Sequence, residues 1–189
     1  VIRKEKTEPQ PLPYDLNELQ RDANKRYGFS AKKTLNLLQN LYERHKVVTY
    51  PRTDSRYLTT DMVDTMLERL EALPSEYRRE TRIPLQNKGK VLAKRVFNND
   101  KVSDHHAIIP TEEKAHLAEL AGDERKIYDL IVRRFLTLFY PSYKYETVQI
   151  EFSVEKEKFT ARQTAVIDLG FKMVSNDAAE TKQGDSVKV

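Results

Sequence analysis

Three side chains that could act together on a phosphate lie within five residues of the sequence, at Tyr50, Arg52 and Asp54. Pro51 disfavours helical backbone for the residue before it, so we expect Tyr50 on extended backbone. Because alternate residues of an extended chain project to one side, Tyr50 and Arg52 are predicted to bracket a single phosphate. Asp54 also has a plain interpretation as a turn or helix-cap residue.

A tyrosine hydroxyl becomes a nucleophile only when its proton can leave or its anion is stabilised. An unperturbed pKa near 10 leaves roughly one phenol in a thousand ionised at pH 7. Arg52, and also Arg56, could supply the fixed positive charge. The chain has ten tyrosines, however, and a tyrosine that ends an extended run is most often a packing residue. The residues alone leave both roles of Tyr50 open.

A second group with possible chemistry is the adjacent pair His105 and His106. On extended backbone the two rings point to opposite faces, so the pair is a poor chelate and does not favour zinc. One histidine beside a reacting phosphate could donate a hydrogen bond or hold a proton near neutral pH. An ordinary surface or core histidine is the alternative.

Charge and composition restrict the classes of protein. The 189 residues carry a net charge of +4, but residues 20–60 carry +6 and the remainder −2, a distribution typical of a polyanion partner or of a solvated basic face. The absence of cysteine excludes disulfides and thiolate chemistry, and predicts a reduced, cytoplasmic setting. No apolar run approaches the roughly 20 residues that span a bilayer. The first residues lack an initiator methionine, so we expect a piece of a longer protein.

Apolar residues recur at the spacing of a helix in two neighbouring segments, which predicts two short helices joined by a tight turn. The first is predicted to begin at the N-cap Asn17, with Gln20 completing a capping box, and to end at Gly28. The second begins after Ser30. The pair resembles a helix-turn-helix, although ordinary helix pairing explains it better.

Further along, the sequence predicts a mixture of helix and loop. The expected elements are an extended run at 47–50, a helix from Thr59 or Thr60 to Pro74, mostly loop over 78–100 with a short helix near 91–97, a short helix from Thr111, and a stronger helix over 123–140. The expected apolar face of the helix before Pro74 includes Val63.

After Pro141 the hydrophobic period changes from 3.6 to 2, which predicts a half-buried strand over 148–154 and further strands over 158–162 and 167–174. The fold class is therefore α+β, a helical domain attached to part of a β domain. The predicted division is 1–16, a linker at the edge of the β domain; 17–142, the helical tyrosine-bearing domain; and 143–189, the partial β domain.

These residues occur in an order that resembles the type IA DNA topoisomerases, most closely the topoisomerase III branch found in bacteria. The matching motifs cover residues 19–35, 41–55 and 104–111, the second containing Tyr-Pro-Arg-Thr-Asp-Ser at 50–55 and the third Asp-His-His-Ala-Ile-Ile-Pro-Thr. The resemblance extends over essentially the whole chain. It implies a helical gate domain, helix-turn-helix-like, flanked by segments of a β hinge domain.

The resemblance also implies a mechanism. Tyr50 would attack a phosphodiester of single-stranded DNA to give a transient 5′-phosphotyrosine, which allows strand passage and religation without ATP. Arg52 would stabilise the developing charge and His105 would contact the scissile phosphate, while His106 is assigned no catalytic role. The expected DNA contacts are Gln20, Lys32, Lys33 and Arg56.

The family binds Mg²⁺ on an acidic cluster of a toprim domain, and this chain has no matching set of carboxylates. The chain alone is therefore predicted to bind no metal and to be inactive, as part of a bacterial, nucleoid-associated enzyme. Two other functions fit the residues less well: a noncovalent single-strand-binding module in which Tyr50 stacks or packs, and a metal-dependent hydrolase that uses both histidines.

Overall fold

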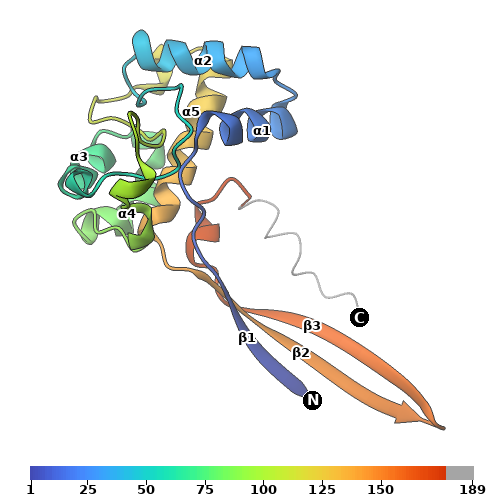
Figure 1. Ribbon diagram of the computed structural model, residues 1–189. Coiled ribbons are helices and arrows are strands. Elements are labelled where there is room, and N and C mark those ends of the chain that lie inside the picture. Colours follow the sequence, from blue (N-terminus) through green and yellow to red (C-terminus); the bar gives the residue numbers. More distant parts are fainter. Residues whose placement is uncertain (178–189) are drawn as a thin grey trace.

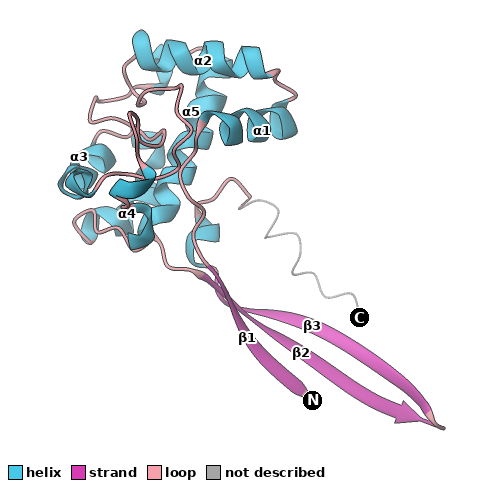
Figure 2. Ribbon diagram, viewed as in Figure 1, coloured by secondary structure: helices cyan, strands magenta, loops and turns pink. Residues whose placement is uncertain are grey.

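The computed structural model describes residues 1–177. Its helices gather in one body and its three strands form a narrow arm that extends away from that body (Figure 1). The described helices and strands, in chain order, are β1 (Ile2–Glu8), α1 (Leu16–Tyr27), α2 (Ala31–Glu43), α3 (Met66–Glu71), α4 (Arg78–Gln86), α5 (Gly122–Leu136), β2 (Tyr143–Val154) and β3 (Glu157–Asp168). Helical body and strand arm are separate in space, which confirms the α+β class (Figure 2).

Helix α5 forms the centre of the body, and both α1 and α2 pack against it. Eight of its fifteen residues are buried. The helix begins where the Glu124 carboxylate accepts a hydrogen bond from the Ala121 backbone N–H at 2.9 Å, and Arg133 and Arg134 lie in its last turn. Charges placed this way complement the helix dipole. The helix predicted over 123–140 is confirmed, with its final turn of the tighter 3₁₀ type before Pro141.

The two predicted N-terminal helices are present, and one of the two predicted caps is wrong. Ser30 caps α2 by accepting from the Lys33 N–H at 3.1 Å. Helix α1, however, is capped by Asp15, whose carboxylate accepts from the Glu18 N–H at 2.8 Å, two residues before the predicted Asn17. Asp15 is the better cap because an ionised acceptor interacts favourably with the helix dipole.

The segment predicted as mostly loop over 78–100 contains α4, which was not expected, whereas the short helix expected near 91–97 is present as the 3₁₀ turn Lys94–Val96. Pro84 made a helix there unlikely from sequence, because a proline removes one N–H from the helical ladder. In the fold the carbonyl that Pro84 leaves free, that of Glu80, accepts a hydrogen bond of 2.7 Å from the Tyr140 hydroxyl. A distant side chain therefore stabilises the interrupted helix.

Three other expectations need correction. The helix expected from Thr111 is absent there; the Thr111 hydroxyl donates to the Lys46 carbonyl at 2.7 Å, and a single 3₁₀ turn follows only at Leu117–Glu119. The helix before Pro74 begins with a 3₁₀ turn, Thr60–Thr65, whose geometry leaves Val63 48% exposed rather than on the buried face. The strand expected over 167–174 is instead the end of β3 and the 3₁₀ turn Gly170–Met173.

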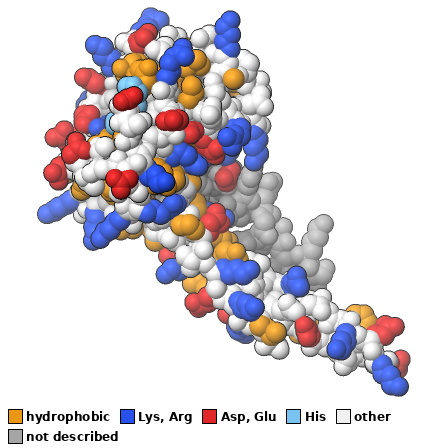
Figure 3. Space-filling model, viewed as in Figure 1, with side chains coloured by type: hydrophobic (Ala, Val, Ile, Leu, Met, Phe, Trp, Pro, Cys, Tyr) orange, Lys and Arg blue, Asp and Glu red, His pale blue; other side chains and the backbone are white. Residues whose placement is uncertain are grey.

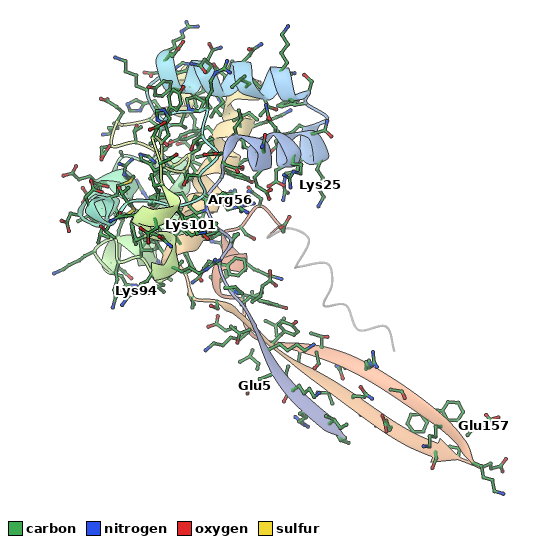
Figure 4. All side chains as sticks on the ribbon, in the orientation of Figure 1. Glu5, Lys25, Arg56, Lys94, Lys101 and Glu157 are labelled. Carbon is green, nitrogen blue, oxygen red and sulfur yellow. The ribbon has the colours of Figure 1, made fainter. Side chains whose placement is uncertain are left out.

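The arm is an antiparallel sheet with strand order β1-β2-β3. The strand expected to be half-buried over 148–154 is mostly exposed: Ile150, Phe152 and Val154 all lie on the surface. Phe152 stacks on Phe159 of the neighbouring strand, near the tip marked by Glu157 (Figure 4). The alternating pattern identified the strands, but their burial depends on what covers the sheet, which a periodicity cannot reveal. The last twelve residues of the predicted third domain lie outside the described residues.

Candidate functional site

The backbone before Tyr50 is held by a neighbouring extended segment, residues 105–110. Val48 forms a bridge with Pro110, and the Thr49 N–H donates to the Ile109 carbonyl at 3.0 Å. The Thr49 hydroxyl also donates to the Ala107 carbonyl at 3.1 Å and accepts from the Ile109 N–H at 3.0 Å. The expected extended run at 47–50 is therefore present, as a single bridge between two loops rather than a strand.

Two aromatic rings surround the half-buried side chain of Tyr50. The His105 imidazole stacks on the phenol ring, with 3.9 Å between centroids and 23° between planes. The Tyr42 ring, near the end of α2, meets Tyr50 edge-on at 5.6 Å and 88°. The phenol is therefore in contact with one ring from the end of the preceding helix and with one ring from a segment more than fifty residues away in the sequence.

Hydroxyl groups that follow Tyr50 tie the same loop to the segment that carries His105. The Thr53 hydroxyl donates to the His105 carbonyl at 3.3 Å and accepts from the Ser55 N–H at 3.1 Å. The Ser55 hydroxyl donates to the Lys101 carbonyl at 2.8 Å. Thr53 and Ser55 are both buried, so these bonds lie away from solvent. The two loops thus form one hydrogen-bonded unit.

A pocket of about 440 Å³ opens beside this unit and is lined by Arg52 and His105. Arg52 is exposed, and among residues 1–177 it makes no ion pair with a carboxylate. An arginine that no protein carboxylate neutralises is available to an external anion. Tyr50, Arg52 and His105, chosen from the sequence as one site, are therefore brought together.

His106, the neighbour of His105, bonds to the backbone. Its Nδ1 lies 2.8 Å from the Ala107 carbonyl oxygen, and because a carbonyl can only accept, Nδ1 carries the proton. Burial lowers the pKa of His106, with nearby Arg69 and His105 acting in the same direction. The two histidines point to different surroundings, as the extended backbone predicted.

Three deeply buried tyrosines have surroundings unlike those of the half-buried Tyr50. Burial raises the pKa of Tyr14, Tyr77 and Tyr128, and hydrogen bonds from Tyr14 and Tyr77 to carboxylates raise those two further. A phenol with a raised pKa is a poor nucleophile near neutral pH. These tyrosines support the core.

Comparisons with known proteins show the family of the chain. A protein-family model described as DNA topoisomerase matches residues 1–189. The chain is 45% identical to DNA topoisomerase 3 of Staphylococcus aureus (strain USA300) over 195 aligned residues, which cover 100% of the chain and 27% of that protein.

The chain belongs to the DNA topoisomerase family.

Further relatives support this conclusion. DNA topoisomerase 3 of Bacillus thuringiensis (strain Al Hakam) is 48% identical over 182 residues, covering 95% of the chain and 25% of the relative. The structure of full-length topoisomerase I from Thermotoga maritima superposes with a TM-score of 0.65 and 25% identity, covering 92% of the chain and 28% of that protein. The resemblance to type IA and topoisomerase III enzymes is confirmed. The topoisomerase chain spans about a quarter of the length of these relatives.

The expected DNA contacts of the topoisomerase chain lie in several different settings. Lys32 is exposed on α2, whereas Lys33 pairs with Asp123 at 2.9 Å. The Gln20 amide donates to the Ala31 carbonyl at 3.0 Å. Arg56 donates to two backbone carbonyls of the linker between β1 and α1, at 3.2 and 3.3 Å, close to where the body meets the arm (Figure 4).

Positive side chains do not gather on one face in the view of Figure 3; Lys and Arg are spread over the body and along the arm. The basic residues of 20–60 have different settings: Lys25, Arg26 and Arg56 line one pocket with Arg95, Arg134 and Lys172, whereas Lys33 pairs with Asp123. The role of the four expected DNA contacts stays a prediction.

Sequence reasoning did not assign Tyr42, Thr49 and Thr53 to the site. The signal for the threonines was their position one residue before Tyr50 and three residues after it, where a β-branched hydroxyl can bond across to another segment. Nothing in the sequence indicates that the segment at 105–109 is the partner.

The Mg²⁺ that the family resemblance implies does not fit the described part of this chain. Among residues 1–177, no three His, Asp or Glu side chains converge as a metal site, which also disfavours the hydrolase that would use both histidines. No described helix has the length and hydropathy needed to cross a bilayer.

Proposed function

We propose that this chain is the tyrosine-bearing part of a type IA DNA topoisomerase and that Tyr50 is its nucleophile. The observation that supports this role is the stack of His105 on the Tyr50 ring at 3.9 Å, beside an exposed Arg52 that pairs with no described carboxylate. A phenol, an imidazole and a guanidinium at one surface are the groups that transfer of a phosphoryl group to tyrosine requires.

In the proposed step the Tyr50 oxygen attacks the phosphorus of a single-stranded DNA phosphodiester. An oxygen–phosphorus bond to tyrosine forms, the bond to the 3′ oxygen breaks, the phenol proton leaves and the 3′ oxygen takes up a proton. Religation is the reverse attack by the 3′ hydroxyl. One phosphate ester replaces another, so the step needs no ATP.

Arg52 and His105 have separate roles in this step. The Arg52 guanidinium stabilises the charge that develops on the phosphate oxygens, since fixed donors aimed at developing charge lower a barrier most. His105 lies against the phenol face and can donate to a nonbridging oxygen or relay a proton. Its stacking on Tyr50 also holds the ring in its orientation.

The remaining parts of the reaction belong to the rest of the parent enzyme. Its Mg²⁺ would lie in a toprim domain elsewhere in the longer protein, and this chain alone is expected to be inactive. The proposed partners are single-stranded DNA and the other domains of the parent chain, in the bacterial cytoplasm with the nucleoid.

The test is covalent trapping. The full-length parent enzyme is mixed with end-labelled single-stranded DNA and stopped with denaturant, and the adduct is resolved by electrophoresis. Tyr50→Phe should abolish the adduct and leave DNA binding intact. Tyr57→Phe, a change of the same kind seven residues later, is the control and should retain the adduct. An adduct at wild-type level in Tyr50→Phe would show that another residue is the nucleophile.

Arg52 is tested in the same assay. Arg52→Ala should slow cleavage by about 2 to 4 kcal/mol in barrier, roughly 30- to 1,000-fold, the loss typical when one donor to developing charge is removed. Arg44→Ala, which changes another exposed arginine, the C-cap residue of α2, is the control and should change cleavage little. An unchanged rate in Arg52→Ala would refute its role.

The alternative is a noncovalent module that binds single-stranded nucleic acid. In such a module the half-buried Tyr50 could stack on a base, and the Lys and Arg side chains within residues 20–60 could contact phosphates. That module would retain DNA in a salt-sensitive way and form no adduct in the wild-type parent.

A further inference from the structure

Another pocket of the helical body shares no lining residue with the site around Tyr50. It has a volume of about 530 Å³ and is formed by the start of α3, the turn that follows α4 and the segment after that turn. Its lining residues are Val63, Asp64, Leu67, Lys88, Gly89, Lys90, Val91, Lys94 and Phe97. Lys94 lies on the lower left of the body in Figure 4. We call this hollow the α3–α4 pocket.

Part of the α3–α4 pocket is apolar. Val91 is buried, and Leu67 and Phe97 are half-buried. Val63 is 48% exposed because it lies in the 3₁₀ turn Thr60–Thr65 rather than on the buried face of a helix. Four apolar side chains that line one hollow at the surface can receive the apolar side chain of a partner.

The walls of the pocket are fixed in the free protein. The Gly89 N–H donates to the Pro84 carbonyl at 2.9 Å, which ties the turn to α4. Gly89 has φ +68°, and a Cβ added there would lie 2.8 Å from the Leu67 backbone nitrogen, so glycine permits the close approach to α3. Phe97 is held by its bridge to Leu58. The pocket is therefore preformed, which reduces the entropy lost on binding.

Positive charge is in excess at this pocket. Lys88, Lys90 and Lys94 are exposed, and within residues 1–177 none of them forms an ion pair with a carboxylate. Asp64 is the one carboxylate of the lining, so three positive charges against one negative charge leave a net charge of +2. Ammonium groups that no protein carboxylate neutralises favour an acidic partner.

A peptide suits this combination better than a nucleic acid does. Sites for single-stranded nucleic acid depend on aromatic rings and arginines, on which bases stack. This lining has three aliphatic side chains, a single half-buried phenylalanine and no arginine. Its volume of about 530 Å³ can receive one or two large apolar side chains of a peptide. Carboxylates on either side of them would meet the lysines.

We propose that the α3–α4 pocket is a docking site for an acidic peptide segment of another protein. Large apolar side chains of that segment contact Val63, Leu67 and Phe97, and its carboxylates pair with the three lysines. The exposed Asp64 carboxylate accepts from a backbone N–H of the segment. The inference goes beyond the proposed function and does not depend on the chemistry at Tyr50.

The experiment selects peptides on the full-length parent enzyme. A phage-displayed library of random dodecapeptides is panned on the wild-type enzyme, with Val63→Asp as the counter-selection. Val63 is exposed, so this variant should fold, and its new carboxylate should repel an acidic peptide. Peptides that prefer the wild type should contain more Asp and Glu than the unselected library, together with at least one Leu, Ile, Phe or Trp.

An enriched peptide is then synthesised with a fluorescent label, and its Kd is measured by anisotropy. Reversing two charges of the pocket together, Lys90→Glu with Lys94→Glu, should weaken binding about 10-fold or more, because attraction becomes repulsion. The matched control is Lys101→Glu with Lys114→Glu, which reverses two exposed lysines outside the pocket. It should change the Kd by less than about twofold, since distant surface charges are screened by salt.

Several results would overturn the docking site. They are the absence of any peptide that prefers the wild type over Val63→Asp, enriched peptides without an acidic excess, and a Kd that the Lys90 and Lys94 reversals leave unchanged. A parent enzyme that self-associates and becomes monomeric in Val63→Asp would show that the pocket binds a second copy instead.

DNA binding separates this inference from the proposed function. The variant with Lys90→Glu and Lys94→Glu should keep the Tyr50 adduct and the affinity for single-stranded DNA. A weaker, less salt-dependent affinity for DNA in that variant would show that the pocket is a nucleic-acid surface, which would overturn the docking site. An adduct that survives Tyr50→Phe would overturn the proposed function alone.

Discussion

Thr49 is the residue whose loss should most directly loosen the loop that carries Tyr50. Its hydroxyl bonds to two backbone groups of the facing segment, the Ala107 carbonyl and the Ile109 N–H, both on residues that are fully buried. Thr49→Val removes the hydroxyl and keeps the branched shape, so it creates no cavity.

The two backbone groups are affected unequally. The Ala107 carbonyl keeps the hydrogen bond from His106 Nδ1 at 2.8 Å, whereas the Ile109 N–H has no other described partner. A buried group left unsatisfied costs about 1 to 3 kcal/mol, and the lost bond to Ala107 adds about 0.5 to 1.5 kcal/mol. We expect Thr49→Val to lower the free energy of unfolding by about 2 to 4 kcal/mol, a large part of a typical total of about 5 to 15 kcal/mol.

The assay is urea unfolding of the 189-residue chain followed by far-ultraviolet circular dichroism. With an m-value of about 2 kcal/mol/M the midpoint should fall by about 1 to 2 M. Thr49→Ser keeps the hydroxyl, loses one methyl group and should cost only about 1 kcal/mol. The reasoning fails if Val and Ser destabilise equally, or if Val changes the free energy by less than about 0.5 kcal/mol.

Three further predictions concern stability. Arg56→Met removes both donors to the linker carbonyls at 3.2 and 3.3 Å, and should speed limited proteolysis of the linker by several-fold while Arg56→Lys has an intermediate effect. Because burial lowers the pKa of His106 below 6.5, the unfolded chain binds the proton more readily. The free energy of unfolding should be highest above pH 6.5 and fall as the pH drops below it, and a urea titration of His106→Gln should show a smaller fall. Gly170→Ala should lower the melting temperature by several degrees, since Gly170 has φ +50° and an added Cβ would lie 2.4 Å from two backbone carbonyl oxygens; an unchanged melting temperature would contradict this.

Local signals in the sequence were enough for much of the fold. The stop at Gly28, the cap at Ser30 and the end of α5 before Pro141 each depend on the conformational limits of one residue type, and all three are observed. The change of hydrophobic period after Pro141 located β2 and part of β3, because successive side chains of a strand face opposite sides of the sheet.

The wrong predictions concern features that depend on contacts between residues far apart in the sequence. Helix α4 persists past Pro84 because the Tyr140 hydroxyl reaches the Glu80 carbonyl, sixty residues away in sequence. The sequence of β2 shows alternation but not what covers it, so its distal residues were wrongly expected to be half-buried. No strand was predicted within residues 1–16, the segment assigned to a linker at the edge of the β domain; there β1 pairs with β2, more than 130 residues away in the sequence.

For the candidate site, the sequence by itself determined which groups are present: a phenol and a guanidinium two residues apart on extended backbone, and a pair of histidines that cannot both face them. These follow from covalent geometry and side-chain chemistry, which act over a few residues. Only the tertiary structure decided that His105 lies on the Tyr50 ring, since that contact closes a loop of more than fifty residues. It is held by the backbone bonds of Thr49 and Thr53, whose partners no local pattern specifies.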